Sequence, residues 1–320
     1  MEHDQLVAPG TAHVMSSYLT CEVATVSRSG TPVAWPVSGV WRPADQTFVL
    51  STSIGFAQKA LNVRRDARVA LLFSDPTGSG SGSAAGQDQP GQVLVQGDGA
   101  CPDEIVTSFS RNGDLWRKID SAQPSSRALS GGRLTRRLLD VYYMRLIISV
   151  TPAAVTTRPA LTGAGRPLSV PAMPGLPASY ARELGDFTSG VLARLDDDGL
   201  PTLDRVVPEP ADGGLLVPGI EAKPGPASLL FHRHDEQLAG NRSLVVLGEL
   251  IEGTGGLVFR PDRVVDGVRT AGLLTPFRFV RGLRARAQAY LDRRGLERPV
   301  VAWDELEAIQ ARVDADTASR

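Results

Sequence analysis

The stretch STSIGFAQKALNVRRDARVALLF, residues 51–73, holds three local patterns that together decide the predicted fold. The small hydroxyl residues Ser51, Thr52 and Ser53 close an apolar segment, 48–52, that is typical of a β-strand. Ser53 is also a favourable N-cap for the helical pattern of residues 54–65. The segment ARVALLF then returns to strand character. The stretch therefore predicts a strand, a helix and a second strand in direct succession.

The cation in this helix is unusual for the chain, whose only lysines are Lys59, Lys118 and Lys223. Lysine offers a compact point charge, whereas arginine offers a planar fork, so the two suit different partners. In the predicted helix Gly55, Lys59 and Asn62 share one stripe beside the hydroxyl run. A helix N-terminus favours anions, so this pattern outlines a phosphate site. The same spacing is equally typical of a capped surface helix with solvated cations.

Strand patterns on both sides of this stretch predict an antiparallel meander with one inserted helix. A short helix near residues 15–19 precedes the predicted strands, which are residues 22–26, 33–41 with a break near Pro36, 48–52, 67–73, 92–97 and 143–150. Residues 76–91 are rich in glycine and serine and predict a mobile loop. Residues 103–140 read as helical.

The same order of signals returns after a proline- and glycine-rich linker, which indicates an internal duplication. Five later segments match earlier ones in order, and these are GVLARLDDDGLPTLDRVV, ADGGLLV, PASLLFHRHDE, SLVVLGE and GLVFRPDRVV. The second copy lacks the hydroxyl run, and its prolines disfavour the inserted helix. The predicted division is 1–158 for the first domain, 159–178 for the linker, 179–270 for the degenerate second domain and 271–320 for a C-terminal helical segment.

Composition narrows the classes of partner. The formal net charge is −1 and no long basic tract is present, so nucleic acid and anionic membranes are not expected partners. Cys21 and Cys101 fit no zinc or disulfide pattern, which favours a reducing compartment. The N-terminal residues lack a signal-peptide pattern, and no apolar run is long enough to span a membrane. We expect a cytoplasmic protein that binds a small molecule, with no metal.

The stretch 51–73, preceded by GTPVAWPV and followed by VLVQGDGA, resembles the pyridoxamine 5'-phosphate oxidase-like, FMN-binding split β-barrel superfamily. Within it the stretch looks most like the actinobacterial flavin and deazaflavin oxidoreductase branch, in which a K-x-x-N-x-R-R-D run follows an ST strand end. The resemblance covers residues 11–158. It implies a mainly β (α+β) fold, with two split β-barrels in tandem and a C-terminal helical segment.

The resemblance also implies a cofactor site. The residues that would hold the cofactor phosphate are Ser51, Thr52, Ser53, Lys59 and Asn62. The isoalloxazine ring would lie along the backbone of Trp35, Pro36 and Val37. Family members are typically homodimers with the cofactor at the subunit interface, so the duplicated chain is expected to be a fused pseudo-dimer, either monomeric or homodimeric. One intact site, in the first half, is expected rather than two.

These features predict a flavin-type oxidoreductase that uses bound FMN, or alternatively the deazaflavin coenzyme F420, for hydride transfer to or from a small organic substrate. No catalytic residue is identified. The alternatives are a non-catalytic flavin- or haem-binding protein of the same fold, and a scaffold that has lost its cofactor. Arg205 is placed near Pro36 by the repeat, although a surface pair with Asp204 or Glu209 is the simpler expectation. The HRH segment, 232–234, is expected to be an exposed strand end.

Overall fold

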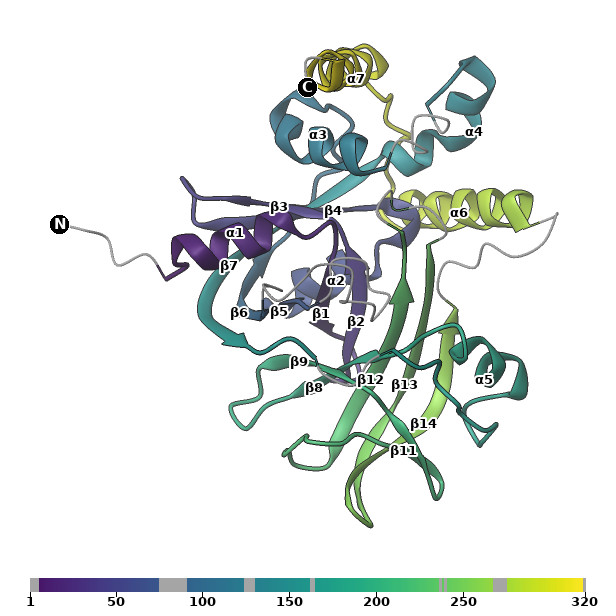
Figure 1. Cartoon of the computed structure of the whole chain (residues 1–320). Coiled ribbons are helices and arrows are strands. Elements are labelled where there is room, and N and C mark those ends of the chain that lie inside the picture. Colours follow the sequence, from purple (N-terminus) through teal and green to yellow (C-terminus); the bar gives the residue numbers. More distant parts are fainter. Residues whose placement is uncertain are drawn as a thin grey trace.

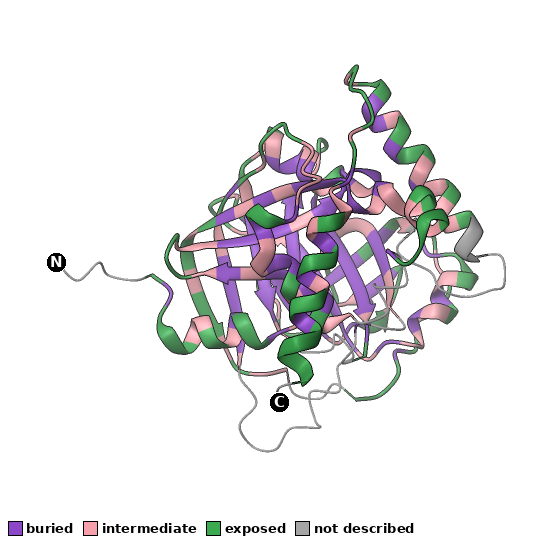
Figure 2. Ribbon diagram, turned by 90° about the horizontal axis from the view of Figure 1, so that it is seen from above, coloured by how far each residue is buried: buried purple, intermediate pink, exposed green. Residues whose placement is uncertain are grey.

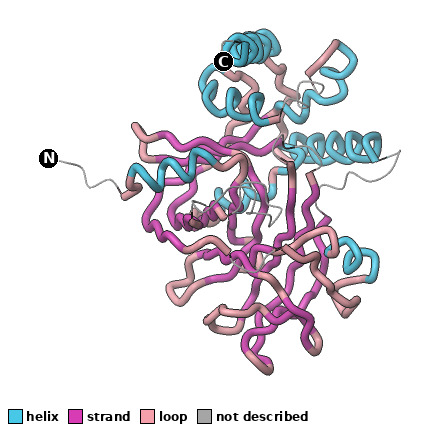
Figure 3. The backbone as a smooth tube through the Cα atoms, in the orientation of Figure 1, coloured by secondary structure: helices cyan, strands magenta, loops and turns pink. Residues whose placement is uncertain are grey.

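The computed structural model describes residues 6–74, 91–123, 130–161, 165–235, 238, 241–266 and 275–318. The chain forms two antiparallel seven-stranded sheets, one in each half of the sequence. Most helices gather at one end of the molecule, over the first sheet, and one short helix lies beside the second sheet (Figure 1 and Figure 3). The predicted mainly β class, with a sheet in each half and a helical C-terminal segment, is confirmed. The predicted loop of residues 76–91 lies almost wholly outside the described residues.

The first sheet has the strand order β2-β1-β5-β6-β7-β4-β3. Its strands are β1 (Cys21–Val26), β2 (Pro32–Val37), β3 (Gly39–Arg42), β4 (Thr47–Ser53), β5 (Arg68–Phe73), β6 (Gln92–Ala100) and β7 (Arg145–Arg158). The expected simple meander is wrong, because the helix after β4 carries the chain across the sheet and β4 pairs with β7 instead of β5. The strand predicted for residues 33–41 divides at Ser38 into β2 and β3.

The second sheet repeats the order of the first. Its strands are β8 (Gly190–Leu195), β9 (Pro201–Val206), β10 (Glu209–Ala211), β11 (Gly214–Leu216), β12 (Gly225–Arg233), β13 (Arg242–Gly253) and β14 (Gly256–Asp266). The observed order β9-β8-β12-β13-β14-β11-β10 is the first order with each strand replaced by its counterpart. The register of the first hairpin repeats as well, because Cys21 pairs with Val37 as Gly190 pairs with Val206.

A bulge recurs at the corresponding place in both sheets. The register between β6 and β7 shifts at Gly97, which faces Pro152, and the register between β13 and β14 shifts at Gly248, which faces Pro261. A Cβ at either glycine would lie 2.1 Å from a backbone carbonyl oxygen of the paired strand, so only glycine fits. The bulges allow the long strands to bend, so that β7 pairs with both β6 and β4, and β14 with both β13 and β11.

The two sheets pack on each other through small and branched side chains. Alternate residues of β1 face opposite ways, so Val23 lies in the core of the first half while Ala24 lies in the layer between the sheets. The buried residues of that layer are Ala24, Val33, Ala34, Ala70, Leu72, Leu94, Val191, Ala193, Leu203, Leu230 and Val245. Figure 2 shows mostly buried strands at the centre of the molecule, with helices that carry exposed residues around and in front of them. Because β1 is buried on both faces, its charged and polar residues, Glu22 and Thr25, are buried together with its apolar ones.

The helices mostly follow the predicted positions but with different bounds. They are α1 (Pro9–Ser17), the 3₁₀ turn η1 (Ile54–Phe56), α2 (Gln58–Arg65), the 3₁₀ turn η2 (Ser110–Asn112), α3 (Gly113–Ala122), α4 (Arg133–Tyr143), α5 (Ala178–Leu184), α6 (Thr275–Asp292) and α7 (Trp303–Ala318). The single helix predicted for residues 54–65 is thus a 3₁₀ turn and an α-helix joined at Ala57. No helix in the described ranges is long and apolar enough to cross a membrane.

Candidate functional site

Three of the residues predicted to bind the cofactor meet at the end of β4. Lys59, in α2, donates a hydrogen bond from Nζ to Thr52 Oγ1 over 3.2 Å. The same ammonium lies 5.8 Å from the ring centroid of Trp35, in β2. Thr52 Oγ1 in turn donates to the carbonyl oxygen of Phe56, which leaves its lone pairs directed to Lys59. Helix α2, strand β4 and strand β2 therefore place a cation, a hydroxyl and an aromatic ring together.

The surroundings of Lys59 disfavour the charged form of its side chain. Burial, and secondly the charge of Arg145, lower the pKa of Lys59 to about 8. No carboxylate of the described residues pairs with this ammonium. Near neutral pH the side chain still carries most of its charge, so a bound anion would be stabilising.

Arg145 is a second cation at this strand end, and the sequence reasoning missed it. It is the first residue of β7 and pairs in register with Ser53 of β4. The residue is 7% exposed, and its Nε finds no hydrogen-bond partner among the described residues. Its guanidinium stacks 4.2 Å from the ring centroid of Tyr142 and 5.2 Å from that of Trp116. Arg145 could have been identified only by predicting that β4, which ends in Ser51–Ser53, pairs with β7, which begins at Arg145.

The structure does not bring Ser53 and Asn62 to Lys59. Ser53 Oγ donates to the Val141 carbonyl oxygen over 2.6 Å and accepts from the Gly55 N–H, so it caps η1 as predicted. Asn62 is fully buried, and its amide contacts Thr25, Gln58 and Arg65. Both side chains are occupied in holding β4 and α2 in place.

The other predicted residues, Ser51, Pro36 and Val37, belong to strands β4 and β2 and pair with neighbouring strands. Ser51 is partly buried and pairs with Ile147 of β7. Pro36 and Val37 pair with Glu22 and Cys21 of β1, and β2 is an edge strand of its sheet. As an edge strand β2 has no strand partner on its outer side, where the Ala34 N–H donates to Ser228 Oγ over 3.4 Å and Pro36 has no N–H to offer.

Helix α6 covers the helix start that was expected to receive the phosphate. A Cβ on Gly55 would lie 2.3 Å from Leu283 Cδ1, which shows how closely α6 packs on η1. Arg286 Nε donates to the Gly55 carbonyl oxygen over 3.0 Å, and the Phe56 and Phe279 rings lie 6.0 Å apart. The start of η1 is therefore closed to an anion by α6.

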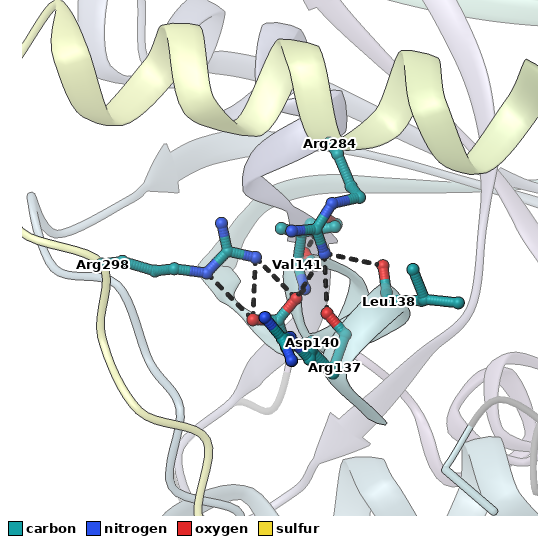
Figure 4. A network of polar contacts seen from close by, with 7 residues as sticks. Arg137, Leu138, Asp140, Val141, Arg284 and Arg298 are labelled. Atoms are coloured by element: carbon teal, nitrogen blue, oxygen red, sulfur yellow. Dashed lines mark hydrogen bonds and ion pairs between the residues drawn. The ribbon is translucent and has the colours of Figure 1, made fainter. Parts of the chain in front are cut away.

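Ion pairs fix α6 and the following segment on helix α4. Asp140 at the end of α4 accepts hydrogen bonds from Arg298 at 2.6–2.9 Å and from Arg284 at 3.3 Å, and Figure 4 shows the two guanidinium groups converging on this carboxylate. Arg284 also donates to the carbonyl oxygens of Arg137 and Leu138. These contacts hold the C-terminal segment against the candidate site.

A buried polar network joins the two sheets close to β2. Arg205 Nη2 lies 2.6 Å from Glu22 Oε1, and His232 Nε2 lies 2.7 Å from the same oxygen. Burial alone would raise the pKa of Glu22, but Arg205 and hydrogen bonds from His232 and Ser74 lower it below its usual value. Arg205 therefore lies beside the strand partner of Pro36, as the repeat placed it, and the alternative of a surface pair is wrong.

The expectation of an exposed HRH segment is also wrong. His232 is 3% exposed and His234 is 6% exposed. His234 Nε2 lies 2.7 Å from Thr20 Oγ1, so the end of β12 packs against the first half of the chain. No group of three or more potential metal-ligating side chains occurs within the described part of the chain.

No protein-family model matches this sequence, and no curated protein sequence is significantly similar to it. Weak similarity to solved structures extends over about half of the chain. A FAD-binding protein from Mesorhizobium loti is 14% identical over 47% of this chain and 91% of its own, with a TM-score of 0.32. An F420 reductase is 18% identical over 47% of this chain and 98% of its own, with a TM-score of 0.29. A haem storage protein from Vibrio cholerae is 12% identical over 47% and 94%, with a TM-score of 0.32. Similarity at this level assigns no function.

Proposed function

We propose that this chain binds the phosphate of a flavin-type cofactor, FMN or the deazaflavin coenzyme F420, beside Lys59 and Thr52, and acts as an oxidoreductase on a small organic substrate. The observation that carries the proposal is the Lys59 ammonium, held at the strand end by a hydroxyl and an aromatic ring with no carboxylate partner among the described residues. A phosphate would supply the missing negative charge and raise the lowered pKa of Lys59.

The residues at the end of β4 that face Lys59 and Thr52 have the chemistry to hold a flavin-type cofactor. Lys59 provides a point charge for the phosphate, and Thr52 fixes its position. The edge strand β2, from Trp35 to Val37, would lie along the ring system. The bound flavin-type group would supply the hydride chemistry, while the protein orients it and limits access of water. Ser53 and Asn62 are not part of the proposed contact set, because their polar groups are already engaged.

The matching strand order, hairpin register and glycine bulges support a tandem duplication that forms an intramolecular pseudo-dimer. The two halves differ in the segment that carries the polar residues of the proposed site. Where β4 ends in the hydroxyl run 51–53, the chain after β11 continues with Pro218, Gly219 and Ile220, and no counterpart of α2 follows. The proposal is therefore one phosphate site per chain, in the first half.

Titration of FMN and of coenzyme F420 into Lys59→Ala tests the proposal. A charge-assisted contact is worth about 1.5–3 kcal/mol, so affinity should fall roughly ten- to a hundredfold. Lys59→Arg should recover part of the loss, because the planar fork does not match a site shaped for a point charge. Lys223→Ala is the matched control, because Lys223 pairs with Asp197 on the surface of the second half.

Binding of both cofactors to Lys59→Ala at the parent affinity would contradict the phosphate assignment. Failure of the parent to bind either cofactor would contradict the proposed function as a whole. Uptake of haem by the parent, without flavin binding, would support the non-catalytic haem-binding alternative.

A further inference from the structure

Arg145 carries a buried guanidinium for which the described chain supplies no hydrogen-bond acceptor. The residue is 7% exposed, and its buried Nε has no hydrogen-bond partner. No ion pair or hydrogen bond of this guanidinium occurs within the described chain. Buried polar groups without partners are costly and rare in native proteins, and a buried charge costs more than a neutral group. Arg145 therefore has the features of a side chain whose partner is a ligand.

The position of this guanidinium is nevertheless fixed. The backbone of Arg145 pairs with Ser53 on one side and exchanges hydrogen bonds of 2.7 and 2.9 Å with Val106 on the other. The rings of Tyr142 and Trp116 hold the side chain by cation–π contacts, with ring centroids 4.2 and 5.2 Å away. Contact with a ring face uses the positive charge and leaves the in-plane N–H groups available. The guanidinium fork is therefore held in place with unused donors.

Arg145 lies at the strand end that Lys59 contacts. Ser53, which pairs with Arg145, directly follows Thr52, whose hydroxyl accepts the hydrogen bond from Lys59. The charge of Arg145 acts on Lys59, because it lowers the pKa of that side chain in addition to the effect of burial. No carboxylate of the described chain counters these two influences on the pKa. Two cations therefore lie near each other at the end of β4, and an anion shared between them would offset their repulsion.

We propose that Arg145 and Lys59 bind one phosphate group together, and that this group is a terminal phosphate monoester, as in FMN, rather than a phosphodiester, as in coenzyme F420. The inference rests on the proposed cofactor site and selects between its two candidate cofactors. A monoester presents three terminal oxygens, so two can accept from the Arg145 fork while the third accepts from Lys59, whereas a diester presents only two. A monoester also carries a second negative charge above a pKa of about 6, which suits a pair of cations.

Titration of FMN, riboflavin and coenzyme F420 into Arg145→Met tests the proposal. Riboflavin has the same ring as FMN but lacks the phosphate, so its affinity should be equal in the variant and the parent. The affinity for FMN should fall roughly ten- to a hundredfold, so the preference for FMN over riboflavin should shrink by the same factor. The affinity for coenzyme F420 should fall less than that for FMN. A purely structural role of Arg145 would instead weaken FMN and riboflavin alike.

The melting temperature of the ligand-free protein separates ligand binding from structural support. An unpaired buried guanidinium costs stability, so Arg145→Met should leave this temperature unchanged or raise it. The rise in melting temperature that FMN produces should become smaller in the same variant. Arg42→Met is the matched control, because Arg42 donates two hydrogen bonds of 2.8 Å to Asp114. This control should lower the ligand-free melting temperature and keep the preference for FMN over riboflavin.

Failure of this inference can be distinguished from failure of the proposed function. If the parent binds FMN and Arg145→Met keeps the parent's preference for FMN over riboflavin, the role of Arg145 is overturned and the proposed function stands. If Arg145→Met loses affinity for FMN and coenzyme F420 by the same factor, the monoester assignment is overturned. If the parent binds inorganic phosphate through Arg145 and Lys59 but does not bind FMN, the shared phosphate site is supported and the proposed function is contradicted.

Discussion

Replacement of Glu22 by glutamine should strongly destabilise the protein, because this carboxylate neutralises Arg205 between the two sheets. The side chains of Arg205 and Glu22 are 2% and 1% exposed, and their charged atoms lie 2.6 Å apart. Removal of one partner from a buried pair typically costs about 3–5 kcal/mol, because the other charge stays buried. A typical unfolding free energy is about 5–15 kcal/mol, so the loss should be easily measured by urea unfolding.

Two comparisons isolate the cause. Glu22→Leu combined with Arg205→Met removes both charges and should recover most of the lost stability. Asp197→Asn breaks the Lys223 pair, whose side chains are 79% and 76% exposed, and should leave the urea midpoint unchanged within error. A urea midpoint for Glu22→Gln equal to that of the parent would refute the reasoning, because the buried Arg205 guanidinium would then have no carboxylate partner and should destabilise the fold.

The same carboxylate predicts the direction of a pH effect. The folded-state pKa of Glu22 is below its usual value, so the network is fully stabilising above the unfolded-state pKa of about 4.3. This stabilisation is lost as pH falls through the folded pKa. The difference in unfolding free energy between the parent and Glu22→Gln should therefore be largest near neutral pH and should shrink in acid.

Three further predictions concern the site and the repeat. FMN affinity should fall as pH rises through about 8, where unliganded Lys59 loses its proton, and Lys59→Arg should remove this dependence in a fluorescence titration. Gly55→Ala should lower the melting temperature, because its Cβ would lie 2.3 Å from Leu283 Cδ1, and added Leu283→Ala should restore part of it. Gly97→Ala and Gly248→Ala should lower the melting temperature by similar amounts, since each Cβ would lie 2.1 Å from a carbonyl oxygen; a tolerant Gly248 would argue against equivalent bulges.

The fold class was predictable because strand patterns and turn glycines are recognised within a few consecutive residues of the sequence. Gly30 and Gly199 both have positive φ angles, at 83° and 75°, in the turns that join β1 to β2 and β8 to β9. The pairing of β4 with β7 was not predictable in this way, because nothing within β4 identifies its neighbour across nearly a hundred residues. Arg145 was missed for the same reason, since its place opposite Ser53 depends on that pairing.

Burial by the other half of the chain explains the remaining errors. The HRH segment and Arg205 look like surface residues when only their own neighbours in sequence are considered. Their partners, Thr20 and Glu22, belong to the first half, more than 180 residues away. In a similar way α6 covers Gly55, so the glycine that suggested an open helix start instead permits close packing of Leu283.

The visible spectrum of the purified full-length chain, after incubation with FMN, coenzyme F420 or haem and removal of excess ligand, tests the central claim most directly. The account predicts that a flavin-type absorption band, from FMN or from the deazaflavin, stays with the parent and with Lys223→Ala and is largely lost from Lys59→Ala. A protein that retains neither flavin-type cofactor, or that retains one equally well without the Lys59 ammonium, would contradict it.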